Sequence, residues 1–135
     1  MIEALSHLKT VAFNEAADAV VILDQTQLPL REVYLTLTTA EEIWDAIYKL
    51  KVRGAPAIGI AAAYGIYICI KRELFTSPAG LVERFRQLKE YLVSARPTAV
   101  NLEAALVRME RVLQSVEGKT VETIKADLLR EAFEI

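Results

Sequence analysis

The sequence predicts an α+β domain with a small N-terminal antiparallel three-stranded sheet followed by a bundle of about five helices. Two patterns carry this prediction. Over residues 9–38, apolar residues form short β-branched runs or alternate with polar ones, which is typical of strands. Over residues 39–135, they recur every three or four positions behind polar caps and prolines, which is typical of amphipathic helices. The 135 residues, 53% hydrophobic and 25% charged, indicate a single folded domain, 1–135.

Three segments are predicted to be strands. Lys9–Asn14 is a weak first strand, and Ala19–Leu23 is a β-branched run typical of a buried strand. Glu32–Thr38 alternates between apolar and polar side chains. The polar residues of 14–18 suit a turn and those of 24–29 a loop. These short connections favour an antiparallel meander.

The helices are marked by their start and stop signals. Thr39 and Glu42 match a capping box, and Pro56 suits the first residue of a helix, where its missing N–H costs nothing. Ser77 followed by Pro78 marks another start, and Gly118 a stop. The predicted helices are about 40–50, 56–74, 78–95, 98–117 and 121–135. The last has no stop signal, which fits a fragment but also a complete chain, since terminal helices often stop abruptly.

Composition excludes several kinds of function. The net charge of −2 argues against a nucleic-acid partner. A single cysteine, Cys69, and a single histidine, His7, provide neither a disulfide nor a metal site, and we expect no cofactor. The longest uncharged run, Gly54–Ile70, is shorter than the roughly 20 residues of a membrane span and is interpreted as a buried helix. We therefore expect a cytoplasmic protein with a reduced Cys69.

Two loop-to-helix junctions have the same design. In 53–59 and again in 96–101, an arginine precedes a proline at the start of a helix. A helix N-terminus presents unpaired N–H groups and partial positive charge, and an arginine binds phosphate or carboxylate with two parallel hydrogen bonds. Together the two junctions would clamp one anion. The alternative is that Arg53 and Arg96 simply face water.

Other candidate residues have structural interpretations. Asp24 is expected to end a strand and cap a turn, and Cys69 to be a buried thiol without a nearby group that lowers its pKa. Gly59 and Gly65 are expected to allow close helix packing. The sequence has no phosphate-binding glycine loop, no Ser-His-Asp set and no evident general base with a partner. It therefore predicts an anion site without catalytic machinery.

Three segments in this order, Asp24–Pro29, Lys51–Gly65 and Ala95–Leu102, resemble the methylthioribose-1-phosphate isomerase family. The resemblance covers the N-terminal part of that family's proteins. It implies conversion of 5-methylthioribose 1-phosphate to 5-methylthioribulose 1-phosphate in methionine salvage, without metal or redox cofactor. It also implies a following Rossmann-like domain, absent here, and a homodimeric full-length protein. By motif position, the residues implied to bind this phosphosugar are Arg53, Gly54, Ala55 and Arg96.

The resemblance leaves two alternatives open: an enzyme like ribose-1,5-bisphosphate isomerase, or a non-catalytic regulatory module of the wider initiation factor 2B-like superfamily. The family's catalytic cysteine and aspartate lie beyond residue 135, so Cys69 and Asp24 do not match them and this chain alone is expected to be inactive. Family members often carry aromatic residues after Asn101-Leu102, where this chain has Glu103, which is expected to be exposed.

Overall fold

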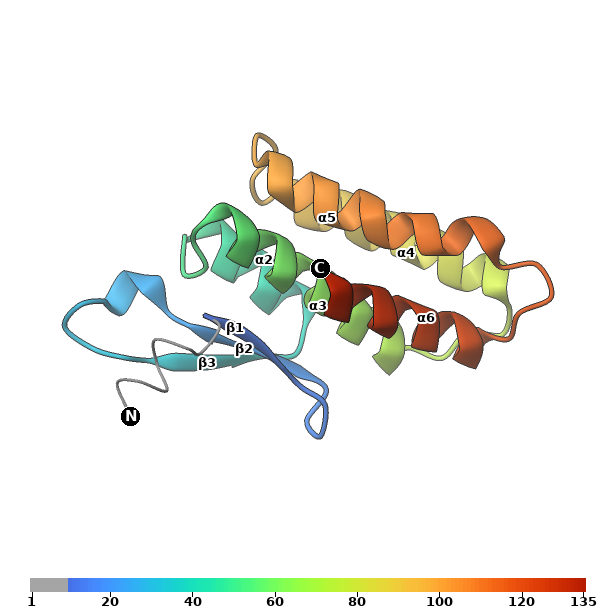
Figure 1. The fold of residues 1–135 in the computed structure, drawn as a ribbon, viewed down its shortest axis with the longest axis horizontal. Helices are drawn as coiled ribbons and strands as arrows, with labels where there is room; N and C mark the ends of the chain where they lie inside the picture. The colour runs from blue at the N-terminus through green and yellow to red at the C-terminus, as the bar shows by residue number, and fades with distance from the viewer. Residues whose placement is uncertain (1–9) are drawn as a thin grey trace.

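A computed structural model describes residues 10–135. Its architecture is the predicted α+β arrangement, with a three-stranded antiparallel sheet followed by five α-helices in this part of the chain. The sheet lies at one end of the molecule and the longer helices extend away from it (Figure 1). His7 and Lys9, on which two of the predictions fall, lie outside the described residues. The elements are β1 (Val11–Asn14), β2 (Ala19–Leu23), η1 (Gln25–Gln27), β3 (Tyr34–Leu37), α2 (Ala40–Tyr48), α3 (Ala55–Arg72), α4 (Pro78–Val93), α5 (Val100–Arg111), η2 (Val112–Ser115) and α6 (Val121–Glu134).

The sheet has the order β1-β2-β3, as the predicted meander requires. β2 coincides with its predicted range and is its central strand, pairing Val20 with Leu37 of β3 and Ile22 with Val11 of β1. Val20 and Ile22 are fully buried, which explains why a continuous β-branched run marks this strand. β3 is shorter than the predicted Glu32–Thr38.

The caps at the helix starts are largely where the sequence predicts them. Thr39 accepts a hydrogen bond from the Glu42 amide at 3.1 Å, and the Glu42 carboxylate accepts one from the Thr39 amide at 3.1 Å, which completes the capping box. Ser77 caps α4 ahead of Pro78. Several helix boundaries differ by one or two residues from the predicted ones, and the largest differences are in α5. α5 begins at Val100 rather than Thr98 because Ala99 has an extended backbone, and after Arg111 the predicted helix continues to Ser115 as a 3₁₀ turn.

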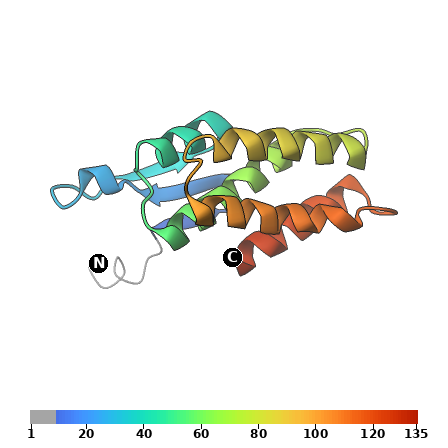
Figure 2. The same cartoon turned by 90° about the horizontal axis from the view of Figure 1, so that it is seen from above.

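α3 lies at the centre of the fold. It contacts the other four helices as well as β1 and β2, and the view in Figure 2 shows the remaining helices arranged around it. Most of its length is buried, including Ala61–Ala63, Ile66 and Ile68–Ile70. None of the helices within residues 10–135, α3 included, combines the length and apolar character that a membrane crossing requires.

Glycine allows the neighbours of α3 to approach closely, as predicted. A Cβ on Gly65 would lie 2.7 Å from Cδ1 and 3.0 Å from Cγ2 of Ile43 in α2. A Cβ on Gly59 would lie 3.3 Å from the Asn101 carbonyl oxygen and 3.4 Å from the Ala105 Cβ in α5. Larger side chains at these positions would push α2 or α5 away.

The last helix is tied to distant parts of the chain. Lys125 of α6 donates hydrogen bonds to the carbonyls of Lys71 at 3.1 Å and Glu73 at 2.7 Å, at the C-terminal end of α3. Phe133 packs edge-on against Phe13 of β1, with ring centroids 5.9 Å apart. Tyr64 of α3 contacts both phenylalanine rings. The first strand and the last helix therefore close the same part of the core.

The contact at Gly65 predicts a specific sensitivity. We expect Gly65→Ala to lower the free energy of unfolding by about 1–2 kcal/mol, because overpacking in a filled core outweighs the better helix propensity of alanine. Urea unfolding measures the change. Gly80→Ala is the matched control, since its Cβ would meet only the Ser77 hydroxyl at an ordinary 3.5 Å. Ile43→Val, which removes the Cδ1 atom, should recover part of the loss. An equal effect of both alanine substitutions would contradict this account.

Candidate functional site

The first junction joins α2 to α3 through residues 49–54. Gly54 is the N-cap of α3 and has a φ of 91°, a backbone conformation that side chains other than glycine rarely adopt. The space around a Cβ built on Gly54 is open, so the backbone here is accessible. Pro56 is in the first turn of α3, one residue later than predicted because the helix already begins at Ala55. The side chain of Ala55 lies outside the described residues, so its ligand contact remains a prediction.

The second junction joins α4 to α5. The chain leaves α4 after Val93 and makes a turn in which the Ala99 amide donates to the Arg96 carbonyl at 3.0 Å. α5 then begins at Val100 with Ala99 as its N-cap. The close approach at Gly59 holds the start of α5 against the first turns of α3, because the Asn101 carbonyl faces Gly59. The two helix N-termini are thus neighbours.

Both of these N-termini lack a side-chain cap, whereas the other described α-helices have one. Thr39 caps α2, Ser77 caps α4 and Thr120 caps α6, each accepting a hydrogen bond from the amide three residues on. Among residues 10–135, no side chain caps α3 or α5. Pro56 contributes no N–H to α3, and the Leu102 amide of α5 donates to the Ala99 carbonyl at 3.1 Å. The remaining first-turn N–H groups and the positive ends of the two dipoles have no side-chain acceptor in this part of the chain.

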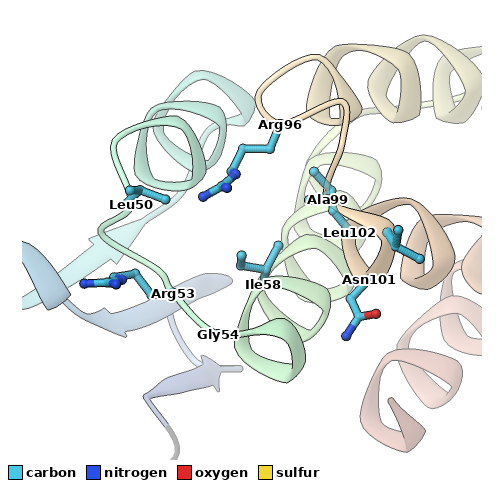
Figure 3. A pocket seen from close by; sticks show the side chains of 9 residues that line it. Leu50, Arg53, Gly54, Ile58, Arg96, Ala99, Asn101 and Leu102 are labelled. Atoms are coloured by element: carbon cyan, nitrogen blue, oxygen red, sulfur yellow. The ribbon is translucent and has the colours of Figure 1, made fainter.

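A cavity of about 470 Å³ lies between the two junctions (Figure 3). This volume is within the usual range for small-molecule sites. Of the predicted site residues, Arg53, Gly54 and Arg96 all line it. The described residues that line it are Leu50, Arg53, Gly54, Ile58, Arg96, Ala99, Val100, Asn101 and Leu102.

The two arginines differ in placement. Arg96 is half-buried and extends from its turn toward Leu50, whereas Arg53 is exposed and its guanidinium points away from Arg96 (Figure 3). Neither guanidinium has a hydrogen-bond or ion-pair partner within residues 10–135, in contrast to Arg84, Arg86 and Arg108, which each pair with a glutamate. Both charges are therefore available to a ligand, and Arg53 would have to rotate to share it with Arg96.

The other candidates lie elsewhere. Asp24 is buried and accepts hydrogen bonds from the Thr26 amide at 2.9 Å and the Thr26 hydroxyl at 2.6 Å, so it caps η1 as predicted. Glu103 is exposed on α5 and is not part of the cavity wall. The described residues contain no group of three or more His, Cys, Asp or Glu side chains that would hold a metal ion.

The sequence analysis missed the apolar part of the wall, chiefly Leu50 and Ile58. Both flank the Arg53–Pro56 segment in the sequence, and Ile58 is one turn into α3. Their closeness in the sequence to that segment could have identified them as candidates for the cavity wall. Nothing in the apolar pattern separates them from ordinary core residues, because Ile58 is itself largely buried.

The family assignment follows from a comparison with protein-family models. Residues 51–135, which contain both junctions, match the model of the initiation factor 2 subunit family. The chain belongs to this family.

Individual relatives are named mainly as isomerases. The chain is 63% identical over 123 residues to a methylthioribose-1-phosphate isomerase of Parabacteroides distasonis and 48% identical over 125 residues to a 5-deoxyribose 1-phosphate isomerase of Petrotoga mobilis. These matches cover 91% and 93% of the chain, which spans only 37% and 36% of the length of these two relatives.

Solved structures share the fold. A 5-methylthioribose 1-phosphate isomerase from Pyrococcus horikoshii matches 99% of the chain with a TM-score of 0.89 and 30% identity, over 37% of its own length. The delta subunit of translation initiation factor eIF-2B from A. fulgidus matches 94% of the chain with a TM-score of 0.83 and 35% identity, over 36% of its own length. The same fold thus occurs in proteins named for different functions.

Cys69 is distant from the cavity and its chemistry is testable. It is 8% exposed inside α3, about three helical turns beyond Ile58. Burial raises the pKa of its thiol to about 11, so almost no thiolate is present at neutral pH.

We expect iodoacetamide at pH 7.5 to leave folded Cys69 unlabelled during a time that fully labels the urea-unfolded chain, as measured by mass spectrometry. Equal labelling rates would contradict the buried-thiol assignment.

Proposed function

We propose that this chain is the N-terminal, substrate-phosphate-binding domain of an aldose–ketose isomerase that converts 5-methylthioribose 1-phosphate to 5-methylthioribulose 1-phosphate in methionine salvage. The observation that supports it best is the convergence of two uncapped helix N-termini and two unpaired arginines on one cavity. The names of the bacterial relatives support the choice of reaction.

The geometry suits a phosphate monoester. A phosphate accepts hydrogen bonds on several oxygens at once, and the cavity offers donors of two kinds, backbone amides and guanidinium groups. Each charge-assisted hydrogen bond contributes about 1.5–3 kcal/mol. Gly54 has no side chain to keep an incoming oxygen from the α3 backbone, which is open at that point.

The reaction determines what binding this phosphate would achieve. The isomerisation breaks the ring bond between C1 and the C4 oxygen, moves a hydrogen from C2 to C1 and turns the C2 hydroxyl group into a carbonyl, while the hydroxyl proton ends on the released C4 oxygen. In these substrates the phosphate is attached to C1, which is one of the two reacting carbons. Residues that hold the phosphate therefore also orient the C1–C2 bond, so that binding energy contributes directly to positioning the reacting atoms.

The acid and base would come from outside these residues. We infer a second, Rossmann-like domain, in keeping with the chain spanning about a third of the length of its relatives. Among residues 10–135, the cavity wall contains no carboxylate, histidine or cysteine. In this division of roles, the chain binds and orients the phosphosugar, and the second domain moves the proton or hydride.

A second candidate is a non-catalytic binding module. The similarity to the A. fulgidus initiation-factor subunit favours it, because that protein shares the fold at 35% identity. An isomerase acting on ribose 1,5-bisphosphate is the alternative within the enzyme class. Assays of the full-length protein with each sugar phosphate separate these candidates, since only an isomerase forms a ketose.

The arginines provide the main test. In the full-length protein we expect Arg96→Ala to raise KM for the phosphosugar by roughly 10- to 100-fold, because a charge-assisted contact with the phosphate is lost. Arg53→Ala is expected to have a smaller effect, since Arg53 is more exposed. Arg86→Ala is the control: this arginine is exposed, pairs with Glu110 at 3.8 Å and does not line the cavity. Unchanged steady-state constants in both cavity variants would remove the clamp assignment.

The 135-residue chain by itself tests the division of roles. We expect it to bind the phosphosugar, seen as an increase in its thermal unfolding midpoint with ligand concentration, but to form no ketose. Ketose formation is followed by proton NMR over hours. Turnover by the purified chain would contradict the placement of the acid and base in another domain. An unchanged midpoint at saturating ligand would contradict the binding role.

A further inference from the structure

Leu50 occupies a position at the end of α2 where glycine is usually found. α2 ends in a Schellman motif, in which the Lys51 amide donates to the Ala46 carbonyl at 2.9 Å and the Leu50 amide to the Ile47 carbonyl at 3.2 Å. This motif places Leu50 at C′ with a φ of 60°, in the left-handed region. Leucine is strained in that region, and glycine is not.

Burial compensates only part of this strain. The Leu50 side chain is 38% exposed. By contrast, Val52, two residues later in the same loop, is 2% exposed and anchors the loop in the core. The loop is therefore fixed without Leu50, and a glycine would satisfy the motif better.

The exposed part of Leu50 faces the cavity. Figure 3 shows its side chain directed toward the space that Arg96 enters, with Ile58 at the base. Ile58 and Leu102 contribute only small surfaces, because they are 7% and 0% exposed, whereas Val100, at the start of α5, is 76% exposed and lines the opposite side. On the α2 side, Leu50 therefore provides the apolar wall, beside the cationic groups that would hold a phosphate.

We propose that Leu50 is a specificity-determining residue that contacts the C5 substituent of the bound sugar 1-phosphate. This inference rests on the proposed function. The substrates in the names of the bacterial relatives both carry phosphate on C1 and no oxygen on C5. A methylthio or methyl group gains from contact with a leucine, whereas the C5 hydroxyl of ribose 1-phosphate would lose hydration there without a hydrogen-bond partner on that side chain. Leu50 selects sugar 1-phosphates with an apolar C5 group.

The test compares four ligands in the full-length protein: methylthioribose 1-phosphate, 5-deoxyribose 1-phosphate, ribose 1-phosphate and ribose 1,5-bisphosphate. We expect Leu50→Gly to reduce the preference in kcat/KM for the methylthio substrate over ribose 1-phosphate by about tenfold, a typical effect of a lost apolar contact in a pocket. Leu50→Met keeps an apolar side chain at the same strained position and should keep the preference.

Stability separates this role from simple packing. In Leu50→Gly the relief of the left-handed strain offsets the lost burial and the greater flexibility of the unfolded chain, so we expect a thermal midpoint close to that of the unmodified protein. Leu74→Gly, which removes a leucine that is 98% exposed and outside the cavity, is the control for loss of an exposed apolar side chain.

Each outcome is decisive. A lost preference in Leu50→Gly at undiminished stability supports the proposal. An unchanged preference, or an equal loss with all four ligands, would overturn it and leave the proposed function intact. A reduced midpoint with an unchanged preference would assign Leu50 to packing. Failure of the unmodified protein to act on any of the four ligands would overturn both proposals.

Discussion

The close packing around α3 is the constraint on which the rest of the structure depends. Gly65 lets α2 lie against α3, and Gly59 lets the start of α5 do the same. Dense interiors leave little room for adjustment, so one additional methyl group would force the Ile43 side chain to shift at Gly65 and α5 to move by a few tenths of an ångström at Gly59. The ends of α2, α3 and α5 meet at the cavity only because these contacts are short. The geometry of the candidate site is therefore set by the helix core rather than by the loops that line it.

The site leaves two kinds of hydrogen-bond donor without a partner among the described residues. The first turns of α3 and α5 have no side-chain acceptor, and the guanidinium groups of Arg53 and Arg96 have no carboxylate partner in the part of the chain described. Elsewhere the same chain uses hydroxyl caps and glutamate partners. An anionic ligand would accept hydrogen bonds from the backbone N–H groups and from the guanidinium groups at once, which is the electrostatic basis for a phosphate site here.

Local signals predicted much of this structure. The β-branched run of β2, the capping box at Thr39 and the Ser77-Pro78 start depend on neighbouring residues and were identified correctly. The two arginine junctions were recognisable for the same reason. The left-handed backbone of Leu50 and the outward direction of Arg53 were not predictable, because they depend on how α2 ends and what surrounds the cavity. The 3₁₀ continuation of α5 was missed because its apolar spacing resembles that of an α-helix.

The contacts between β1 and α6 have a consequence for folding during synthesis. Phe13 leaves the ribosome early, but its partner Phe133 is made almost at the end of these 135 residues. The carbonyls of Lys71 and Glu73 likewise lack their hydrogen bonds from the ammonium group of Lys125 until that residue has been synthesised. A nascent chain that stops before α6 has its first strand and the end of its central helix without these partners. Such non-local contacts are formed late and expose apolar surface until then. We therefore expect a nascent chain that ends before α6 to expose more apolar surface, and to aggregate more readily, than the same chain with α6 complete.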